Sequence, residues 1–272
     1  MLGYTGPSIA LERIVTRPCH SLLQQAQHAD EAKLAVHGDG FGMAWYTEED
    51  AEPGLYRDVL PAWSDGNLTS LCRVVRSHLF LAHVRSGTTG GTSRANCHPF
   101  THGTWSFAHN GQLGNFATVR RRLEALLPDD LFARRMGSAD SEVLFLLLIA
   151  NGLEDDPRAA IEATLAQVAD ASRGGEQPDR ITCVLSDGKR LLGFRHASDG
   201  REPTLYLTRG VLDHGGRALA SEPLDGVAAN WIAVPPQTLV TLNGAAPVMT
   251  SLPVAPRIAV SLGGCEARVT PN

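Results

Sequence analysis

Three short segments carry polar residues that could bind an amino acid. Arg85 directly follows a continuous apolar run, and Asp140 lies in the acidic start of an apolar helical segment. Asn110 and Gly111 follow a run in which apolar and polar residues alternate. Each feature also has an ordinary explanation, because loop arginines, Asn-Gly turns and acidic helix starts are common in proteins. Their combination nevertheless predicts a pocket for an amino acid.

The chemistry follows from what each group can hold. The Arg85 guanidinium can pair with an α-carboxylate through two hydrogen bonds, and the Asp140 carboxylate can hold an α-ammonium group. The Asn110 amide and the Gly111 N–H can donate to an oxyanion that develops on a side-chain carbonyl. Glycine has no Cβ to obstruct that approach. These groups suit the hydrolysis of a γ-glutamyl amide, but they include no nucleophile.

The elements that must position these residues can be read from the apolar pattern. We expect strands at Phe41–Tyr46 and Leu55–Leu60, a helix over Asn67–Ser77 and a buried strand at Leu79–Val84. A Gly/Ser/Thr-rich loop over 85–96 follows.

The next part of the chain is predicted to be helical. Asn115 and Ser138 are expected to cap two helices, the second of which is buried and runs to Gly152. Asp156-Pro157 opens a third helix, because proline suits the first helical position.

After Arg180 the pattern returns to short strands, beginning with a hairpin formed by Ile181–Leu185 and Leu191–Phe194. The remaining predicted strands are Thr204–Thr208, Arg217–Ala220, Trp231–Val234 and Thr238–Leu242. Strands, helices and strands in this order favour an α+β fold with helices covering mostly antiparallel sheets.

Composition narrows the class of protein further. The 272 residues carry a formal charge of -5, with 43% hydrophobic and 19% charged residues. This excludes a disordered chain and gives no basic surface for nucleic acid or an anionic membrane. The five cysteines follow no regular spacing, and we therefore expect reduced thiols in a cytoplasmic protein. No apolar run approaches the roughly 20 residues that a membrane span needs.

Five motifs together resemble the class II glutamine amidotransferases, which are N-terminal-nucleophile hydrolases. The motifs are HGDGFGMAWY, HVR, NCHPF, WSFAHNGQL and SADSE. More narrowly, the chain looks like the stand-alone bacterial branch that includes the γ-glutamyl hydrolase of the ergothioneine pathway. The resemblance extends from Leu2 to about Asn151 and more weakly, through Ala220-Ser221-Glu222-Pro223, to about Leu242.

The resemblance implies a four-layer αββα sandwich, which we assign to one domain over residues 1–252. Little periodicity follows Leu252, and we therefore expect 253–272 to form a loose tail. It implies that Arg85 holds the substrate carboxylate, that Asp140 holds the ammonium group, and that Asn110 and Gly111 form the oxyanion hole. His109 is expected in the substrate pocket, where it and Asp39 serve mainly as structural supports. No cofactor is implied. Ammonia would pass to a synthase partner, or the chain would be a plain γ-glutamyl hydrolase.

The N-terminus departs from the family pattern. Family chains begin Met-Cys-x-x-Leu-Gly, with the cysteine as nucleophile and its α-amine as base. Alignment on Leu2-Gly3 would place that cysteine two residues before Met1. Cys19 could replace it only after proteolysis that removes the first strand. We therefore expect almost no glutaminase activity from the chain as written. Either the true start lies upstream, or the chain is a non-catalytic module that binds glutamine or another γ-glutamyl compound.

A zinc site is the main competing interpretation of the His-rich region. Cys97, His98, His102 and His109 lie close in the sequence. Pro99 and Gly103 argue against one helix presenting His98 and His102 together, and no CxxC or HExxH motif is present. We predict no metal.

Overall fold

The computed structural model describes residues 1–31, 36–87, 91–244 and 246–253. Nearly all of the predicted tail, 253–272, lies outside these residues. No helix in the described ranges has the length and apolar character to cross a membrane.

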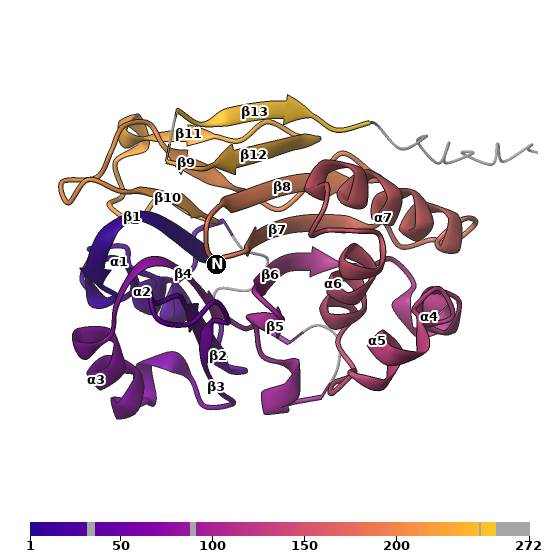
Figure 1. Cartoon of the computed structure of the whole chain (residues 1–272), viewed down its shortest axis with the longest axis horizontal. Coiled ribbons are helices and arrows are strands. Elements are labelled where there is room, and N and C mark those ends of the chain that lie inside the picture. The colour runs from indigo at the N-terminus through magenta and orange to yellow at the C-terminus, as the bar shows by residue number, and fades with distance from the viewer. Residues whose placement is uncertain (32–35, 88–90, 245, 254–272) are drawn as a thin grey trace, which may run out of the picture.

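Two antiparallel sheets form the centre of the molecule (Figure 1). The first sheet contains, in spatial order, β11 (Trp231–Ala233), β9 (Tyr206–Thr208), β10 (Arg217–Ala220), β1 (Leu2–Ala10), β4 (Arg76–Val84), β2 (Phe41–Trp45) and β3 (Gly54–Asp58). The second contains β13 (Val248–Ser251), β12 (Thr238–Leu242), β8 (Leu191–Ala197), β7 (Arg180–Ser186), β6 (Trp105–Gln112) and β5 (Phe100–His102).

Helices cover the outer faces of the two sheets, on opposite sides of the molecule in Figure 1. The first sheet is covered by α1 (Glu12–Val15), α2 (Leu22–Gln27) and α3 (Gly66–Val74). The second is covered by α4 (Phe116–Glu124), α5 (Asp129–Ala133), α6 (Asp140–Ala150) and α7 (Pro157–Ala171). Short 3-10 helices lie at Ala62–Ser64, Arg94–Asn96 and Ala228–Asn230. One apolar core lies under each helical layer and a third lies between the sheets. These layers confirm the predicted αββα sandwich.

The central strand β1 shows how the sequence builds the layers. Its side chains alternate, as they do in any strand. Leu2 and Tyr4 face the helices, whereas Met1 belongs to the core between the sheets. A Cβ on Gly3 would lie 2.7 Å from side-chain atoms of Leu191 and Val184 in the opposite sheet. Glycine at this position therefore allows the two sheets to pack closely.

Several predicted elements are confirmed. Phe41–Trp45 pairs with Gly54–Asp58, and β7 pairs with β8 as a hairpin. Asp156 caps α7 by accepting hydrogen bonds from the backbone N–H groups of Arg158 and Ala159. Helix α6 is buried on all sides from Asp140 to Leu148, as its continuous apolar sequence indicates.

Other predictions were wrong. Helix α3 ends at Val74, because Arg76 and Ser77 already pair with β1 in the first sheet. Asn115 has left-handed backbone at φ 54° and makes no capping bond with its side chain. The position before α6 belongs to Ala139 and not to Ser138.

Candidate active site

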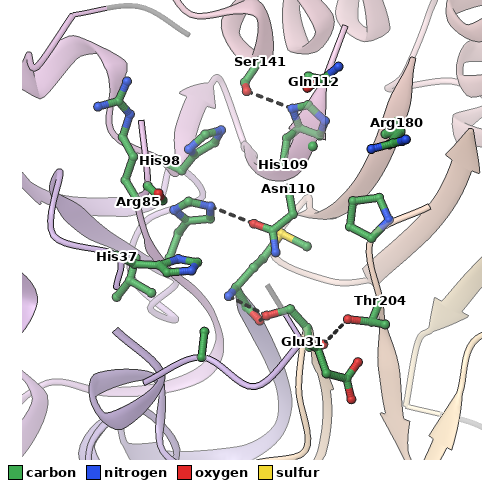
Figure 2. Close-up of a pocket in the computed structure, with 18 of the residues that line it drawn as sticks. Glu31, His37, Arg85, His98, His109, Asn110, Gln112, Ser141, Arg180 and Thr204 are labelled. Carbon is green, nitrogen blue, oxygen red and sulfur yellow. Dashed lines mark hydrogen bonds between the residues drawn. The ribbon is translucent and has the colours of Figure 1, made fainter. Parts of the chain in front are cut away.

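A cavity of about 420 Å³ lies where the first sheet, the second sheet and α6 meet. Its wall includes Met1 just before β1, the ends of β4 and β6 and the starts of β7 and α6. All five predicted site residues line this cavity: Arg85, His109, Asn110, Gly111 and Asp140. Figure 2 shows Asn110 near its centre, with His37 and His98 on one side and His109 and Ser141 above it.

Asn110 and Gly111 do not form a turn; they continue strand β6. They pair with Thr182 and Ile181 of β7. Gly111 has φ +130°, and a Cβ there would lie only 1.8 Å from the carbonyl oxygen of Arg180. Only glycine fits this position, because an L side chain would be both strained and in collision with the neighbouring strand.

The start of α6 is tied to β6 and to the segment that follows it. Asp140 is buried, and its Oδ2 accepts from the backbone N–H of Leu113 at 2.8 Å. Its Oδ1 accepts from the backbone N–H of Ser141 at 2.9 Å. The Ser141 hydroxyl lies 2.9 Å from Nδ1 of His109. Glu142 reaches back to the N–H groups of residues 136 and 137. The acidic segment thus fixes the helix start against the cavity wall.

Arg85 is also buried, with 4% of its surface exposed. Its Nη1 donates to the backbone oxygen of Asp39 at 3.3 Å. The Asp39 carboxylate accepts from the N–H of Gly87 at 2.8 Å. Backbone bonds between Asp39 and Arg85 and between Arg85 and Gly40 complete the link. Asp39 is therefore a support that holds the loop after β4.

Three buried histidines line the cavity beside Asn110. Nε2 of His83 lies 3.1 Å from Oδ1 of Asn110. The rings of His83 and His98 are 4.3 Å apart. Burial holds the pKa of His83 and of His98 well below the usual value, and burial also lowers the pKa of His109. We therefore expect neutral imidazoles at pH 7.

Met1, directly before β1, lines the same cavity. The α-amine of Met1 donates to the Ser221 hydroxyl at 3.0 Å, and the N–H of Ser221 donates to the Met1 carbonyl at 2.9 Å. Burial lowers the pKa of this α-amine to about 5, despite the opposing influence of Glu222. We therefore expect this amine to be uncharged at neutral pH.

Comparison with known proteins identifies the family. The sequence pattern of the class II glutamine amidotransferases matches residues 13–210, well over half of the chain. The chain belongs to the class II glutamine amidotransferases.

Relatives of this amidotransferase include enzymes of two kinds. It is 30% identical to the probable glutamine amidotransferase DUG3 of Saccharomyces cerevisiae, covering 86% of this chain and 78% of that protein. It is 29% identical to the γ-glutamyl-hercynylcysteine sulfoxide hydrolase of Mycobacterium tuberculosis, over 92% and 95% of the two chains. The structure of a glutamine aminotransferase class-II domain protein from Silicibacter pomeroyi superimposes with a TM-score of 0.73 at 34% identity, covering 92% of this chain and 98% of that one.

Sequence reasoning gave no role to several residues that line this amidotransferase cavity. His83 and His98 lie inside the motifs HVR and NCHPF, but their contact depends on how β4 meets the loop before β5. Asn96 accepts from the N–H groups of Ser138 and Ala139, and so joins two motifs. The motifs contained these residues, but a strand or loop pattern cannot show which partner each one meets.

The competing zinc interpretation gains no support from geometry in the described residues. Cys97, His98, His102 and His109 do not bring three ligand atoms together there. One other group does so, formed by His20, Asp30 and Glu222, whose ligand atoms lie within 4.8 Å of one another. The Glu222 carboxylate is already bonded to His20 Nε2 and to the N–H groups of Asp30 and Glu31. These bonds give the three side chains a structural role, which is to hold the segment after α2 in place.

Proposed function

We propose that this amidotransferase hydrolyses a γ-glutamyl amide within one domain, residues 1–252, through a cysteine two residues ahead of Met1. The observation that carries the proposal is the convergence of Arg85, Asn110, Gly111 and Asp140 on one cavity. The names of the relatives support it, because glutamine and the substrate named for the mycobacterial hydrolase are both γ-glutamyl compounds.

In the proposed reaction, Arg85 pairs with the substrate α-carboxylate and Asp140 holds the α-ammonium group. The cysteine thiol transfers its proton to its own α-amine and attacks the amide carbon. The Asn110 amide and the Gly111 N–H donate to the resulting oxyanion. The C–N bond then breaks, the amine leaves with a proton, and a glutamyl thioester remains. Water hydrolyses the thioester to release glutamate and the thiol.

Strand register supports the position of this cysteine. Leu2 pairs with Ala82 of β4, so Met1 lies opposite His83 and a residue two places earlier would lie opposite Arg85. Side chains alternate along a strand, so that residue would share the inter-sheet face of Met1. The Met1 nitrogen would become a peptide N–H and could still donate to Ser221. Two added residues would thus extend β1 by about 7 Å into the cavity.

The decisive test adds Met-Cys-Arg before Met1 and measures ammonia release from glutamine. The initiator methionine is removed before cysteine, which exposes the thiol and its amine. We expect turnover at least about 10³-fold above that of a matched Met-Ala-Arg chain, because removing a nucleophile has effects of this size or larger. Equal activity in the two extended chains, or full activity in the 272-residue form, would contradict the proposal.

Substrate choice is a second part of the proposal. The cavity continues past the predicted glutamyl site to Glu31, Arg201 and Thr204, and Glu31 accepts from the Tyr206 hydroxyl at 2.7 Å. We place the leaving amine at this outer end. Faster hydrolysis of γ-glutamyl dipeptides than of glutamine would indicate a hydrolase that acts alone. Preference for glutamine would indicate a synthase partner that accepts ammonia.

Substitution of Arg85 tests ligand binding without turnover. We expect Arg85→Lys in the 272-residue chain to weaken binding of glutamine or a γ-glutamyl dipeptide about 30-fold, or about 2 kcal/mol, because lysine cannot pair bidentately. Isothermal titration calorimetry measures the change. Arg158→Lys, on α7 and away from the cavity, is the control. Unchanged affinity in Arg85→Lys would remove Arg85 from the binding site. Binding by the 272-residue chain, without turnover in the cysteine-extended chain, would favour the non-catalytic binding module.

The compartment is also a proposal. The four described cysteines, at positions 19, 72, 97 and 183, are all free thiols. Free thiols are typical of the reducing cytoplasm, where we propose that the reaction takes place.

A further inference from the structure

We propose that His83 is a positioning residue that fixes the orientation of the Asn110 amide and so determines whether the oxyanion hole is formed. The proposal rests on the proposed function of Asn110 and deepens it. Its basis is the contact between Nε2 of His83 and Oδ1 of Asn110, at 3.1 Å. Neither the five predicted residues nor the motif pattern pointed to this role.

The two orientations of the Asn110 amide have opposite consequences. With Oδ1 directed at His83, the Nδ2 group is turned away and can donate to an oxyanion. If the amide were flipped, Nδ2 would donate to His83 and Oδ1 would repel the developing negative charge. Asn110 lines the cavity, and within the described residues its Nδ2 has no hydrogen-bond partner. This nitrogen is also not among the unpaired polar atoms that are fully buried, so it has some exposure. It is therefore available to a ligand.

The protonated nitrogen of His83 selects between these orientations. Oδ1 can only accept, so a hydrogen bond to it requires a proton on Nε2. Nδ1 of His83 is buried without a hydrogen-bond partner in the described residues. A proton there would leave a buried N–H donor unpaired, which costs about 1–3 kcal/mol, and only the flipped Asn110 amide could still bond to Nε2. The environment therefore favours the neutral Nε2–H form.

His98 strengthens this preference. Its ring packs 4.3 Å from that of His83, and neither of its nitrogens has a partner in the described part of the chain. Burial lowers the pKa of His83 well below its usual value, and the nearby His98 is the second cause. A neutral His83 carries a single ring proton, so its location can be specific.

The contact also joins the two sheets. His83 lies on β4 of the first sheet and Asn110 on β6 of the second, and each points into the space between them. Alternation places His83 with Leu81 and Asn110 with Ala108, both of which belong to the core between the sheets. The orientation of the oxyanion donor is therefore set by the way the sheets pack.

Kinetics of the cysteine-extended chain test the role. We expect His83→Leu to lower kcat about 10²-fold with KM changed less than about threefold, because the oxyanion forms only along the reaction. His83→Gln, which keeps a donor at a similar reach, should recover most of kcat. In an Asn110→Ala background, His83→Leu should have almost no further effect. Equal losses in Leu and Gln variants, or additive losses with Asn110→Ala, would overturn the proposal.

A spectroscopic measurement keeps the proposal testable if these variants fold poorly. We expect ¹⁵N NMR of the histidine-labelled 272-residue chain to show His83 as the neutral Nε2–H tautomer, and Asn110→Ala to weaken that preference. A Nδ1–H tautomer in the unsubstituted chain would overturn the proposal. This readout does not depend on turnover. Inactivity of the cysteine-extended chain would therefore count against the proposed function alone.

Discussion

Replacing Asn110 with alanine in the cysteine-extended chain is expected to lower kcat for γ-glutamyl amide hydrolysis by about 10²–10³-fold, or about 3–4 kcal/mol. The large effect follows from where Asn110 lies. It is fixed in strand β6 by pairing with β7 and is oriented by the contact with His83. A donor that is held before the reaction begins needs no reorganisation when the oxyanion develops.

The substitution should act on the transition state more than on the bound substrate. We therefore expect KM to change little, and steady-state kinetics will separate the two effects. Asn67→Ala, on the exposed start of α3, is the matched control and should leave both constants unchanged. An Asn110→Ala enzyme with normal kcat and a raised KM would show that this side chain binds the substrate and does not stabilise the oxyanion.

Gly111→Ala is expected to lower the free energy of unfolding by about 3 kcal/mol or more, and to abolish turnover in the cysteine-extended chain. The new Cβ would lie 1.8 Å from the Arg180 carbonyl oxygen, and the backbone there has φ +130°. Because the obstacle is the backbone of a paired strand, relief requires separation of β6 from β7. That movement would also displace the Gly111 N–H from the oxyanion site.

Urea unfolding of the 272-residue chain measures the loss of stability through its midpoint and slope. Gly103→Ala is the control, since Gly103 also has positive φ, +52°, but no atom lies within 4 Å of its added Cβ. We expect a loss of about 1–2 kcal/mol there, from backbone strain alone. If the two variants lost equal stability, the collision with β7 would not be the cause.

The sequence predicted most clearly those elements in which local pattern and tertiary packing agree. Arg217–Ala220 and Thr238–Leu242 are strands with the predicted bounds, and the apolar segment after Asp140 is the buried helix. Asn110-Gly111 was more difficult. The same dipeptide that favours a turn is held in a strand here, because β7 supplies hydrogen bonds along its length. Pairing with a distant strand therefore outweighed the local preference of Asn-Gly for a turn.

The site was predicted in its residues but not in its contacts. Arg85 and Asp140 stand out in the sequence because charge next to apolar runs is conspicuous. His83 does not, because it occupies the inter-sheet face of a strand, where a core residue would give the same alternation. The bond between His83 and Asn110 depends on how two sheets pack, and no pattern within either strand encodes that packing.

Strand β1 is held on both sides, by β10 and by β4, and its first residues lie at the centre of a seven-stranded sheet. A chain end is usually the part of a protein that frays most easily. Here the first residues of β1 pair with a neighbouring strand on both sides, as residues in the interior of a sheet do. The alternation of side chains in the sheet would fix the direction of a reactive group at the N-terminal end of β1. That group would have lost most of its rotational freedom before substrate binds.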